Sequence, residues 1–269
     1  MQLIDIQGTN VDGIPRPLVA VGLDAVSCKY ELHEHHHEKC ELIYTVKGLL
    51  SCEADGHIWT IPPQCALWIP SRIPHRSWAF GRIESYALFI APDLDTGLGN
   101  RCCAVTVSTL LRELLFRVAS SPALYPSDGP EARLLPVVID ELSMARKEQL
   151  RVPMPADPTL RRLANLVMSN PMRKASVAEW ATQLSMSERT LSRRFSQEIG
   201  MSFGQWRHRV HVTLALQWMA DGRSIKSIAF NLGYESASSF ITMFKKTLGQ
   251  SPARYLAQRE DMINDLTPD

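Results

Sequence analysis

Residues 224–256 read SIKSIAFNLGYESASSFITMFKKTLGQSPARYL, and this stretch decides the fold of the C-terminal part of the chain. Ile225 and Ile228, with further apolar residues at helical spacing, predict a first short helix. Gly233 is expected in the turn that follows, and Ser236 is expected to cap a second helix. The stretch therefore predicts two helices joined by a tight turn.

The second of these helices has two contrasting faces. Its apolar stripe consists of Phe240, Phe244 and Leu248. The opposite side carries small and polar residues, namely Ser238, Ile241, Thr242 and Lys245. A helix presented in this way from a small helical domain fits the major groove of DNA.

The pattern resembles the signature of the AraC/XylS family of bacterial transcription regulators. The match rests on fourteen positions at fixed spacing: Ile225, Ile228, Ala229, Gly233, Tyr234, Ser236, Ser239, Phe240, Phe244, Lys245, Gly249, Ser251, Pro252 and Tyr255. The resemblance implies a DNA-binding domain with two helix-turn-helix units, controlled by an N-terminal effector domain. An ordinary helical bundle is the alternative interpretation of the same residues.

The motif occurs a second time, upstream, in residues 176–203. Val177 takes the place of Ile225 in the first helix, and Leu191 takes the place of Phe240 in the second. The later copy is longer by a single residue between these points, and this residue is expected in its turn. An internal repeat of this kind indicates two related supersecondary units.

The predicted DNA contacts lie on the outward faces of the two second helices. Arg189, Ser192 and Arg193 face away from the buried stripe, and the resemblance places them at base-contacting positions; an arginine binds guanine through two hydrogen bonds. Arg194 lies nearer the core and is expected to make a phosphate or structural contact. The later helix has no side chain that donates such a pair of bonds, so it is expected to supply affinity and register. The full predicted set is Ser187, Arg189, Thr190, Ser192, Arg193, Ser196, Ser236, Ser238, Ser239, Ile241, Thr242 and Lys245.

Composition agrees with this division. The chain has 269 residues, enough for two domains. Residues 1–155 hold 14 Lys and Arg against 18 Asp and Glu, whereas residues 156–269 hold 15 against 10, so the half with the repeats is the positive one. Neither an apolar run of membrane-spanning length nor a signal peptide is recognised, which predicts a cytoplasmic protein without membrane contact. The six cysteines are expected to stay reduced, as buried small apolar residues.

The chain is expected to divide into an effector-sensing domain (1–100), a helical dimerisation segment (101–151) and a DNA-binding domain (152–269). Residues 18–90 read as strands and turns, and residues 105–120 and 131–149 have helical periodicity. The proline-rich segment 152–158 is the predicted linker, followed by seven helices and no strand. An apolar stripe that includes Leu135, Ile139 and Leu142 is expected either to join two copies or to pack within one chain.

A histidine-rich segment marks the N-terminal part. His35, His37 and Glu41 have the spacing of the first motif of cupin barrels, and on one extended strand they would share a face. His75 is the expected fourth ligand, and this set suits divalent Fe, Mn, Ni or Zn. The sequence departs from the cupin motifs at Gln64 and lacks an Asn after His75. A structural or ligand-lining role is the alternative, so no cofactor is required.

Residues 56–78 also resemble the effector domain of a subgroup of the same family, with its Pro-Pro, Trp-Ile-Pro and Pro-His elements. The predicted effector-binding set combines the histidines with nearby aromatic residues: His35, His37, Tyr44, Trp59, Trp68, His75 and Trp78. Aromatic residues of strands are, however, also common core residues.

These observations together predict the α+β class: an N-terminal cupin-like β-barrel with a helical segment, then an all-α double helix-turn-helix domain. The expected function is sequence-specific transcription regulation, not enzymatic catalysis. Expected partners are double-stranded DNA, a small-molecule effector, a second copy of the chain and, for an activator, RNA polymerase. Two alternatives stay open: a cytosolic metal-dependent cupin enzyme, and a DNA-binding protein that needs no effector.

Overall fold

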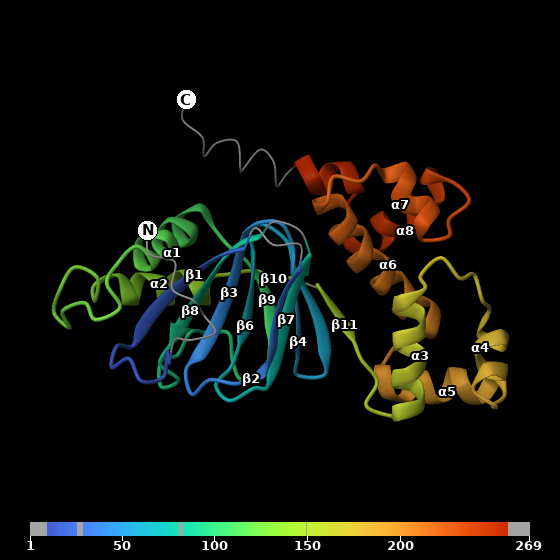
Figure 1. Cartoon of the computed structure of the whole chain (residues 1–269), viewed down its shortest axis with the longest axis horizontal. Coiled ribbons are helices and arrows are strands. Elements are labelled where there is room, and N and C mark those ends of the chain that lie inside the picture. The colour runs from blue at the N-terminus through green and yellow to red at the C-terminus, as the bar shows by residue number, and fades with distance from the viewer. Residues whose placement is uncertain (1–9, 26–28, 81–82, 149, 258–269) are drawn as a thin grey trace. The chain divides into compact units, whose positions relative to one another are not determined.

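The computed structural model describes residues 10–25, 29–80, 83–148 and 150–257 (Figure 1). Cys28, one of the cysteines expected to be reduced, lies outside these ranges. Contacts divide the chain into two compact units, one of residues 1–55 with 59–150 and one of residues 56–58 with 151–269. The dimerisation segment and the sensing domain predicted separately therefore share a unit.

The first unit is built from two antiparallel sheets. The first sheet has the strand order β1-β8-β3-β6-β9-β10. Its central strand β3 pairs with β8 on one side and β6 on the other, with Leu42 opposite Leu88 and Trp68. The bounds are β1 (Leu18–Ala25), β3 (Cys40–Lys47), β6 (Cys65–Ile69), β8 (Ile83–Ile90), β9 (Cys103–Thr106) and β10 (Lys147–Glu148).

The second sheet contains β5, β4, β7 and β2 in this order. Its strands are β2 (Lys29–His35), β4 (Leu50–Ala54), β5 (His57–Ile61) and β7 (His75–Phe80). β2 pairs with β7, and His35 stands directly opposite His75 at the end of that ladder. A register shift between Leu32 and His35 interrupts the pairing just before this point.

Two helices cover one face of the first sheet. α1 (Thr109–Ala119) packs on β1 and β8, and α2 (Leu134–Ser143) packs on α1. Their apolar faces join the sheet residues Leu42, Tyr44 and Trp68 in one core. Val138 and Leu142 of α2 have no exposed surface. Leu142 is thus used within the unit, and a partner chain cannot reach it without unfolding this core.

The expectation of two uninterrupted helical segments was wrong at their ends. Residues 103–106 form β9 and residues 147–148 form β10, and these two strands pair with each other. β9 also pairs with β6, so it lies inside the sheet between β6 and β10. Tertiary pairing therefore overrides the helical periodicity of the flanking residues.

The second unit is helical in its larger part. It contains α3 (Pro158–Ser169), α4 (Val177–Gln183), α5 (Glu188–Ile199), α6 (Phe203–Ala220), α7 (Ile225–Asn231) and α8 (Ala237–Leu248), and residues 252–257 form a further helical turn. Its core includes the fully buried Trp180, Trp206, Phe195 and Phe240.

The pair α4–α5 repeats as the pair α7–α8. Val177 begins α4 as Ile225 begins α7, and Glu188 begins α5 as Ala237 begins α8. The step from the first helix start to the second is longer by a single residue in the later pair. This confirms the internal repeat and places the extra residue before the start of α8.

The predicted linker is more ordered than its prolines suggest. β11 (Arg151–Pro153) extends into it, and the described residues after the linker form helices without a strand, as expected. The Met154 N–H donates to the Gly56 carbonyl, and the Trp206 indole N–H donates to the Pro153 carbonyl at 2.7 Å. These hydrogen bonds order the segment, because its backbone groups have protein partners where those of a free linker would bind water.

Candidate functional site

Helix α5 presents a polar, cationic face from a rigid base. Ser187 caps it by accepting a hydrogen bond from the Thr190 N–H at 3.1 Å. Leu191 and Phe195 are fully buried, which fixes the rotation of the helix about its axis. The opposite face leaves Arg189, Arg193 and Ser196 exposed and Ser192 half-buried. Two arginines on such a face supply the planar donor pairs that recognise guanine edges.

Arg194 has a structural contact. Its guanidinium donates to the Asp157 carboxylate at 2.6 Å. Asp157 in turn caps α3 by accepting from the N–H groups of Thr159 and Leu160. Arg194 therefore links α5 to the start of α3. This is the structural contact, one of the two roles predicted for it.

Helix α8 offers a different surface. Ser236 caps it, and Phe240, Met243 and Phe244 are buried, whereas Leu248 is half-buried. Its outward face consists of the exposed Ser238, Thr242 and Lys245 with the half-buried Ile241.

Two hydroxyls of α8, one of them on this face, already have partners nearby in the chain. Thr242 donates to the Ser238 carbonyl at 2.9 Å, and Ser239 donates to the Ser236 carbonyl at 2.9 Å. Because these protons are used within α8, its outward face has fewer free donors for base edges than that of α5.

The two turns use a left-handed residue at equivalent positions. In the turn between α4 and α5 it is Ser185, with φ of 55°. In the second it is Gly233, with φ of 80°, and a Cβ at this position would lie 2.8 Å from the Met172 carbonyl oxygen. Glycine is thus required in the second turn by conformation and by space, whereas the first turn accepts a strained serine.

The first unit gathers the predicted metal ligands. One ligand atom from each of His35, His37 and His75 lies within 4.8 Å of the others. The Glu41 carboxylate lies 2.9 Å from His75 Nε2 and 3.9 Å from His37 Nε2. Glu41 and His75 are almost completely buried, and we call these four residues the His–Glu cluster.

The ring nitrogens and the carboxylate of this cluster converge at one buried place. His37 Nε2, His75 Nε2 and Glu41 Oε2 are buried and none has a well-directed hydrogen bond among the described residues. The other ring nitrogens are held: His35 Nδ1 lies 2.7 Å from the His33 carbonyl and His75 Nδ1 lies 2.9 Å from the Ile73 carbonyl. Backbone carbonyls in these positions orient metal-binding imidazoles in many proteins.

Burial and mutual contact set the charges of the cluster. Burial by itself raises the pKa of Glu41, but the histidines, His75 first, lower it below its ordinary value. Burial lowers the pKa of His35 and His37, so these rings are neutral near pH 7 and their nitrogens are available as ligands. For His75 the carboxylate of Glu41 outweighs burial and raises the pKa.

The route to this arrangement differs from the predicted one. The parity of residues 35, 37 and 41 along one strand does not apply, because β2 ends at His35 and β3 begins at Cys40. His37 lies in the connection, against the ring of Phe89 at 5.0 Å. The cluster forms because two strands of different sheets and the start of β7 converge.

The predicted effector-binding residues do not gather in one place. Tyr44 and Trp68 belong to the core under α1 and α2, and burial raises the pKa of Tyr44 to about 12. Along β3, Tyr44 has the parity opposite to that of Glu41. Trp59 is buried in β5 with its N–H on the Ala54 carbonyl, and Trp78 is half-buried against the Arg76 guanidinium. His35, His37 and His75 of this set lie together with Glu41, whereas Tyr44 and Trp68 belong to a different core cluster.

The cysteines that the structure describes are poor nucleophiles. Cys40, Cys52, Cys65, Cys102 and Cys103 form no disulfide bond within the described residues. Burial raises the pKa of Cys102 to about 12 and that of Cys52 well above its usual value. Because the thiolate is the reactive form, these groups are held in the unreactive state.

Known proteins carry the same two parts. The AraC-like ligand binding domain matches residues 21–102, and the Helix-turn-helix domain matches residues 180–258. The HTH-type transcriptional regulator NimR of Escherichia coli is 33% identical over 96% of this chain and 94% of its own. This chain belongs to the AraC family of transcription regulators.

Two further relatives cover different shares of the chain. The regulator RipA of Corynebacterium glutamicum is 33% identical over 38% of this chain and 31% of its own length. The crystal structure of fatty-acid-bound ToxT from Vibrio cholerae covers 89% of this chain and 94% of that one, with 17% identity and a TM-score of 0.37.

The family settles the class of function. The chain is an AraC-type regulator with a helix-turn-helix DNA-binding domain and an N-terminal ligand-binding domain, and it is not an enzyme. Within the described residues, no helix has the length and apolar character required to cross a membrane.

Proposed function

We propose that this AraC-type regulator chooses its operator mainly through α5 and holds its register mainly through α8. The proposal rests on the difference between the outward face of α5 and that of α8. Arg189 and Arg193 are exposed on α5, whereas the hydroxyls of Thr242 and Ser239 on α8 are bonded within the helix. Lys245 contributes a phosphate contact without sequence choice.

The test compares single-base operator variants. Binding sites are first selected from random duplexes with the full-length protein, and affinities for all single-base changes are then measured for Arg193→Ala and Thr242→Ala. Loss of a two-bond guanine contact costs ~1–3 kcal/mol and relaxes preference at one position. A larger change in base preference from Thr242→Ala than from Arg193→Ala would refute the assignment.

For the first unit we propose that the His–Glu cluster binds a divalent transition metal as part of effector sensing. The residues present fit such an ion: three imidazoles, of which His35 and His37 are neutral, converge with a carboxylate, and their buried ligand atoms face one another rather than other parts of the described chain. The metal would supply a Lewis-acidic position for an oxygen or nitrogen atom of an effector.

Metal content separates this role from a purely structural one. We expect purified full-length protein, loaded with one metal at a time and gel-filtered, to retain close to one equivalent of at least one of Fe, Mn, Ni or Zn. His75→Ala and Glu41→Gln should abolish retention. Trp78→Ala, on the opposite face of β7, is the matched control and should retain the ion. A wild-type protein that retains none of the four metals would refute the proposal.

We further propose that the protein acts as a homodimer in the cytoplasm, contacting RNA polymerase if it activates transcription. Since Leu142 is buried, the dimer surface is assigned to the apolar side chains that α1, α2 and the residue after α2 leave exposed, Leu110, Val137 and Met144. Leu135 and Ile139, the other predicted contacts, are half-buried against the internal core. Sedimentation of the full chain should show a dimer that Val137→Glu weakens; a wild type that stays monomeric at every concentration would contradict it.

A further inference from the structure

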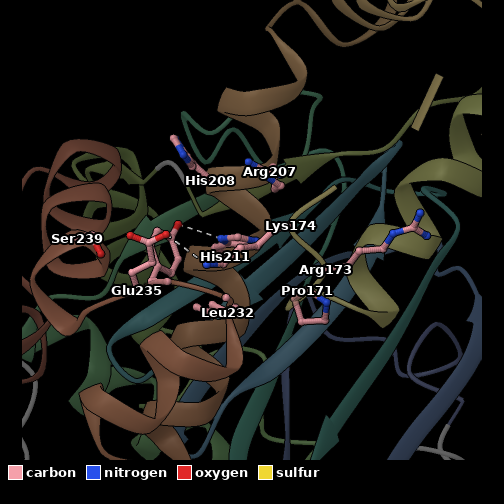
Figure 2. A pocket seen from close by; sticks show the side chains of 11 residues that line it. Pro171, Arg173, Lys174, Arg207, His208, His211, Leu232, Glu235 and Ser239 are labelled. Atoms are coloured by element: carbon pink, nitrogen blue, oxygen red, sulfur yellow. Dashed lines mark hydrogen bonds and ion pairs between the residues drawn. The ribbon is translucent and has the colours of Figure 1, made fainter. Parts of the chain in front are cut away.

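A hollow of about 340 Å³ lies within the second unit, at the junction of the two helix-turn-helix repeats (Figure 2). Three segments that are distant in sequence line it. They are residues 171–174, which precede α4; Arg207, His208 and His211 of α6; and the second turn with the start of α8, from Leu232 to Ser239. We call this hollow the junction pocket.

The junction pocket is rich in cationic groups. Lys174 and Arg207 line it together with two histidines, and Glu235 is its only carboxylate among the described residues. Arg173 also lines it, but its guanidinium stacks on the Trp180 ring at 4.2 Å. Lys174 Nζ lies 3.6 Å from the Glu235 carboxylate, and both side chains are largely exposed. An ion pair of this kind contributes little stability and exchanges easily for another anion.

The wall of the pocket contains donors that no described residue satisfies. His211 is 6% exposed, and its Nε2 has no hydrogen-bond partner among those residues. The Nε of Arg207 is likewise buried and unpartnered, although the same side chain donates to the Ala175 carbonyl. Unsatisfied buried donors are costly, so their presence beside a polar hollow indicates that an acceptor belongs there.

His211 is suited to donate. Its Nδ1 lies 2.9 Å from the Tyr234 hydroxyl. Burial and the neighbouring Arg207 lower its pKa to about 3, so the ring is neutral. When the Tyr234 phenol donates to Nδ1, the ring proton resides on Nε2, the atom without a partner.

The position of the pocket decides which anion it meets. Ser239 in the first turn of α8 lines it, and Lys174 stands two residues before the cap of α4. In helix-turn-helix proteins these helix starts approach the DNA backbone, and two such units bind successive major grooves one helical turn apart. The DNA strand that lies between the two major grooves then passes the junction of the two helix-turn-helix repeats.

We propose that the junction pocket binds a backbone phosphate of the DNA between the two major grooves, with Lys174 as its principal donor and Glu235 as the group it displaces. The proposal rests on the DNA-binding function and adds a sequence-independent contact to it. Lys174 releases Glu235 and pairs with the phosphate, while Arg207 supplies positive potential and His211 supplies a neutral N–H donor from the wall. Glu235 therefore opposes binding, because its charge remains next to the phosphate.

The proposal predicts opposite changes in DNA affinity for two variants, Lys174→Gln and Glu235→Gln. The full-length protein is titrated with a fluorescent duplex of generic sequence at several KCl concentrations. Lys174→Gln should weaken binding roughly fivefold to tenfold near 0.1 M salt and reduce the salt slope by ~0.9, the value for one phosphate. Glu235→Gln should tighten binding roughly twofold to fivefold, since a repulsive charge is removed. Lys174→Arg should restore the slope.

Alternative outcomes overturn the proposal. If Lys174 and Glu235 act only as a structural ion pair, both neutral variants weaken binding, and the signs agree. An unchanged salt slope in Lys174→Gln also refutes the phosphate contact. Thermal shifts with inorganic phosphate at constant ionic strength test a free anion as the source. Lys174-dependent stabilisation by phosphate, with the DNA salt slope unaffected, would show a small-anion site instead.

The same titrations distinguish this proposal from the function it rests on. A wild-type protein that binds no duplex would contradict the DNA-reading assignment itself. A protein whose base preferences change with Arg193→Ala, but whose salt slope ignores Lys174→Gln, would keep that assignment and lose only the junction phosphate.

Discussion

Replacing Gly233 with alanine tests how closely the two helix-turn-helix units must approach each other. Gly233 has φ of 80°, and a Cβ added there would lie 2.8 Å from the Met172 carbonyl oxygen and 3.4 Å from its carbon. Real Cβ atoms do not approach backbone oxygen at 2.8 Å, so the second turn or the segment before α4 must move. That movement would also open the junction pocket, which both segments line.

A matched control separates conformation from contact. Gly222 has φ of 77°, almost the same as Gly233, but a Cβ there meets nothing within 4 Å. Gly222→Ala should therefore cost only the left-handed conformation, about 1–2 kcal/mol. Gly233→Ala should cost that amount plus about 1–3 kcal/mol for forcing an atom into occupied space.

The measurement is native-state hydrogen exchange of the full-length protein, followed by mass spectrometry of peptides from α3 to α8. This readout gives opening free energies for the second unit alone, which a global melting curve of two units would not. We expect the opening free energy of α7 and α8 to fall further in Gly233→Ala than in Gly222→Ala. Equal losses would show that the approach to Met172 is not tight, and the argument from contact would fail.

Three further predictions concern the second unit. Ser185→Gly should raise the opening free energy of α4 and α5 by about 1 kcal/mol, because glycine adopts the φ of 55° without strain; no gain in hydrogen exchange would contradict the assigned strain. His211 has a folded pKa of about 3 against 6.5, so its neutral form stabilises the fold above pH 6.5 and that contribution is lost as pH falls. Between pH 7 and pH 4 the wild type should therefore lose about 3 kcal/mol more opening free energy of the second unit than His211→Gln, measured by hydrogen exchange corrected for the intrinsic exchange rates, and parallel pH profiles would refute the buried neutral ring. Arg194→Ala should lower protection of α3 and α5 through loss of the Asp157 contact while leaving base preferences unchanged, which operator-variant binding would check.

The sequence predicted the second unit well because its signals are local. The structure shows Ser236 accepting from a backbone N–H group where the pattern placed it, and Ser176 and Ser187 cap the helices of the upstream copy in the same way. The repeat read from the sequence transfers directly to helix bounds, since α4 and α7 begin at the matched positions Val177 and Ile225. Short-range chemistry of this kind needs no knowledge of the neighbouring segments.

The first unit shows where such reasoning stops. The residues around Val105 gave no local sign that they would pair with β6, because that pairing is decided by a strand far away in the sequence, Cys65–Ile69. The His–Glu cluster was found for a reason that does not hold, the parity of one strand, whereas it is assembled by β2, β3 and β7. Residues grouped by their spacing can thus lie together in the fold through a geometry other than the predicted one.

The junction pocket was invisible to the sequence for a related physical reason. Lys174, Arg207 and Glu235 come from three separate segments of the chain, so neither helical nor strand periodicity in the sequence groups them. Only the packing of the two repeats against α6 brings the cations together, and Gly233 is the residue whose missing side chain permits it. A glycine that local analysis assigned to a turn is therefore also the condition for a charged surface between the two repeats. If that surface receives a DNA phosphate, the conformation of one turn and the salt dependence of DNA binding are linked, and Gly233→Ala should reduce the salt slope as Lys174→Gln does.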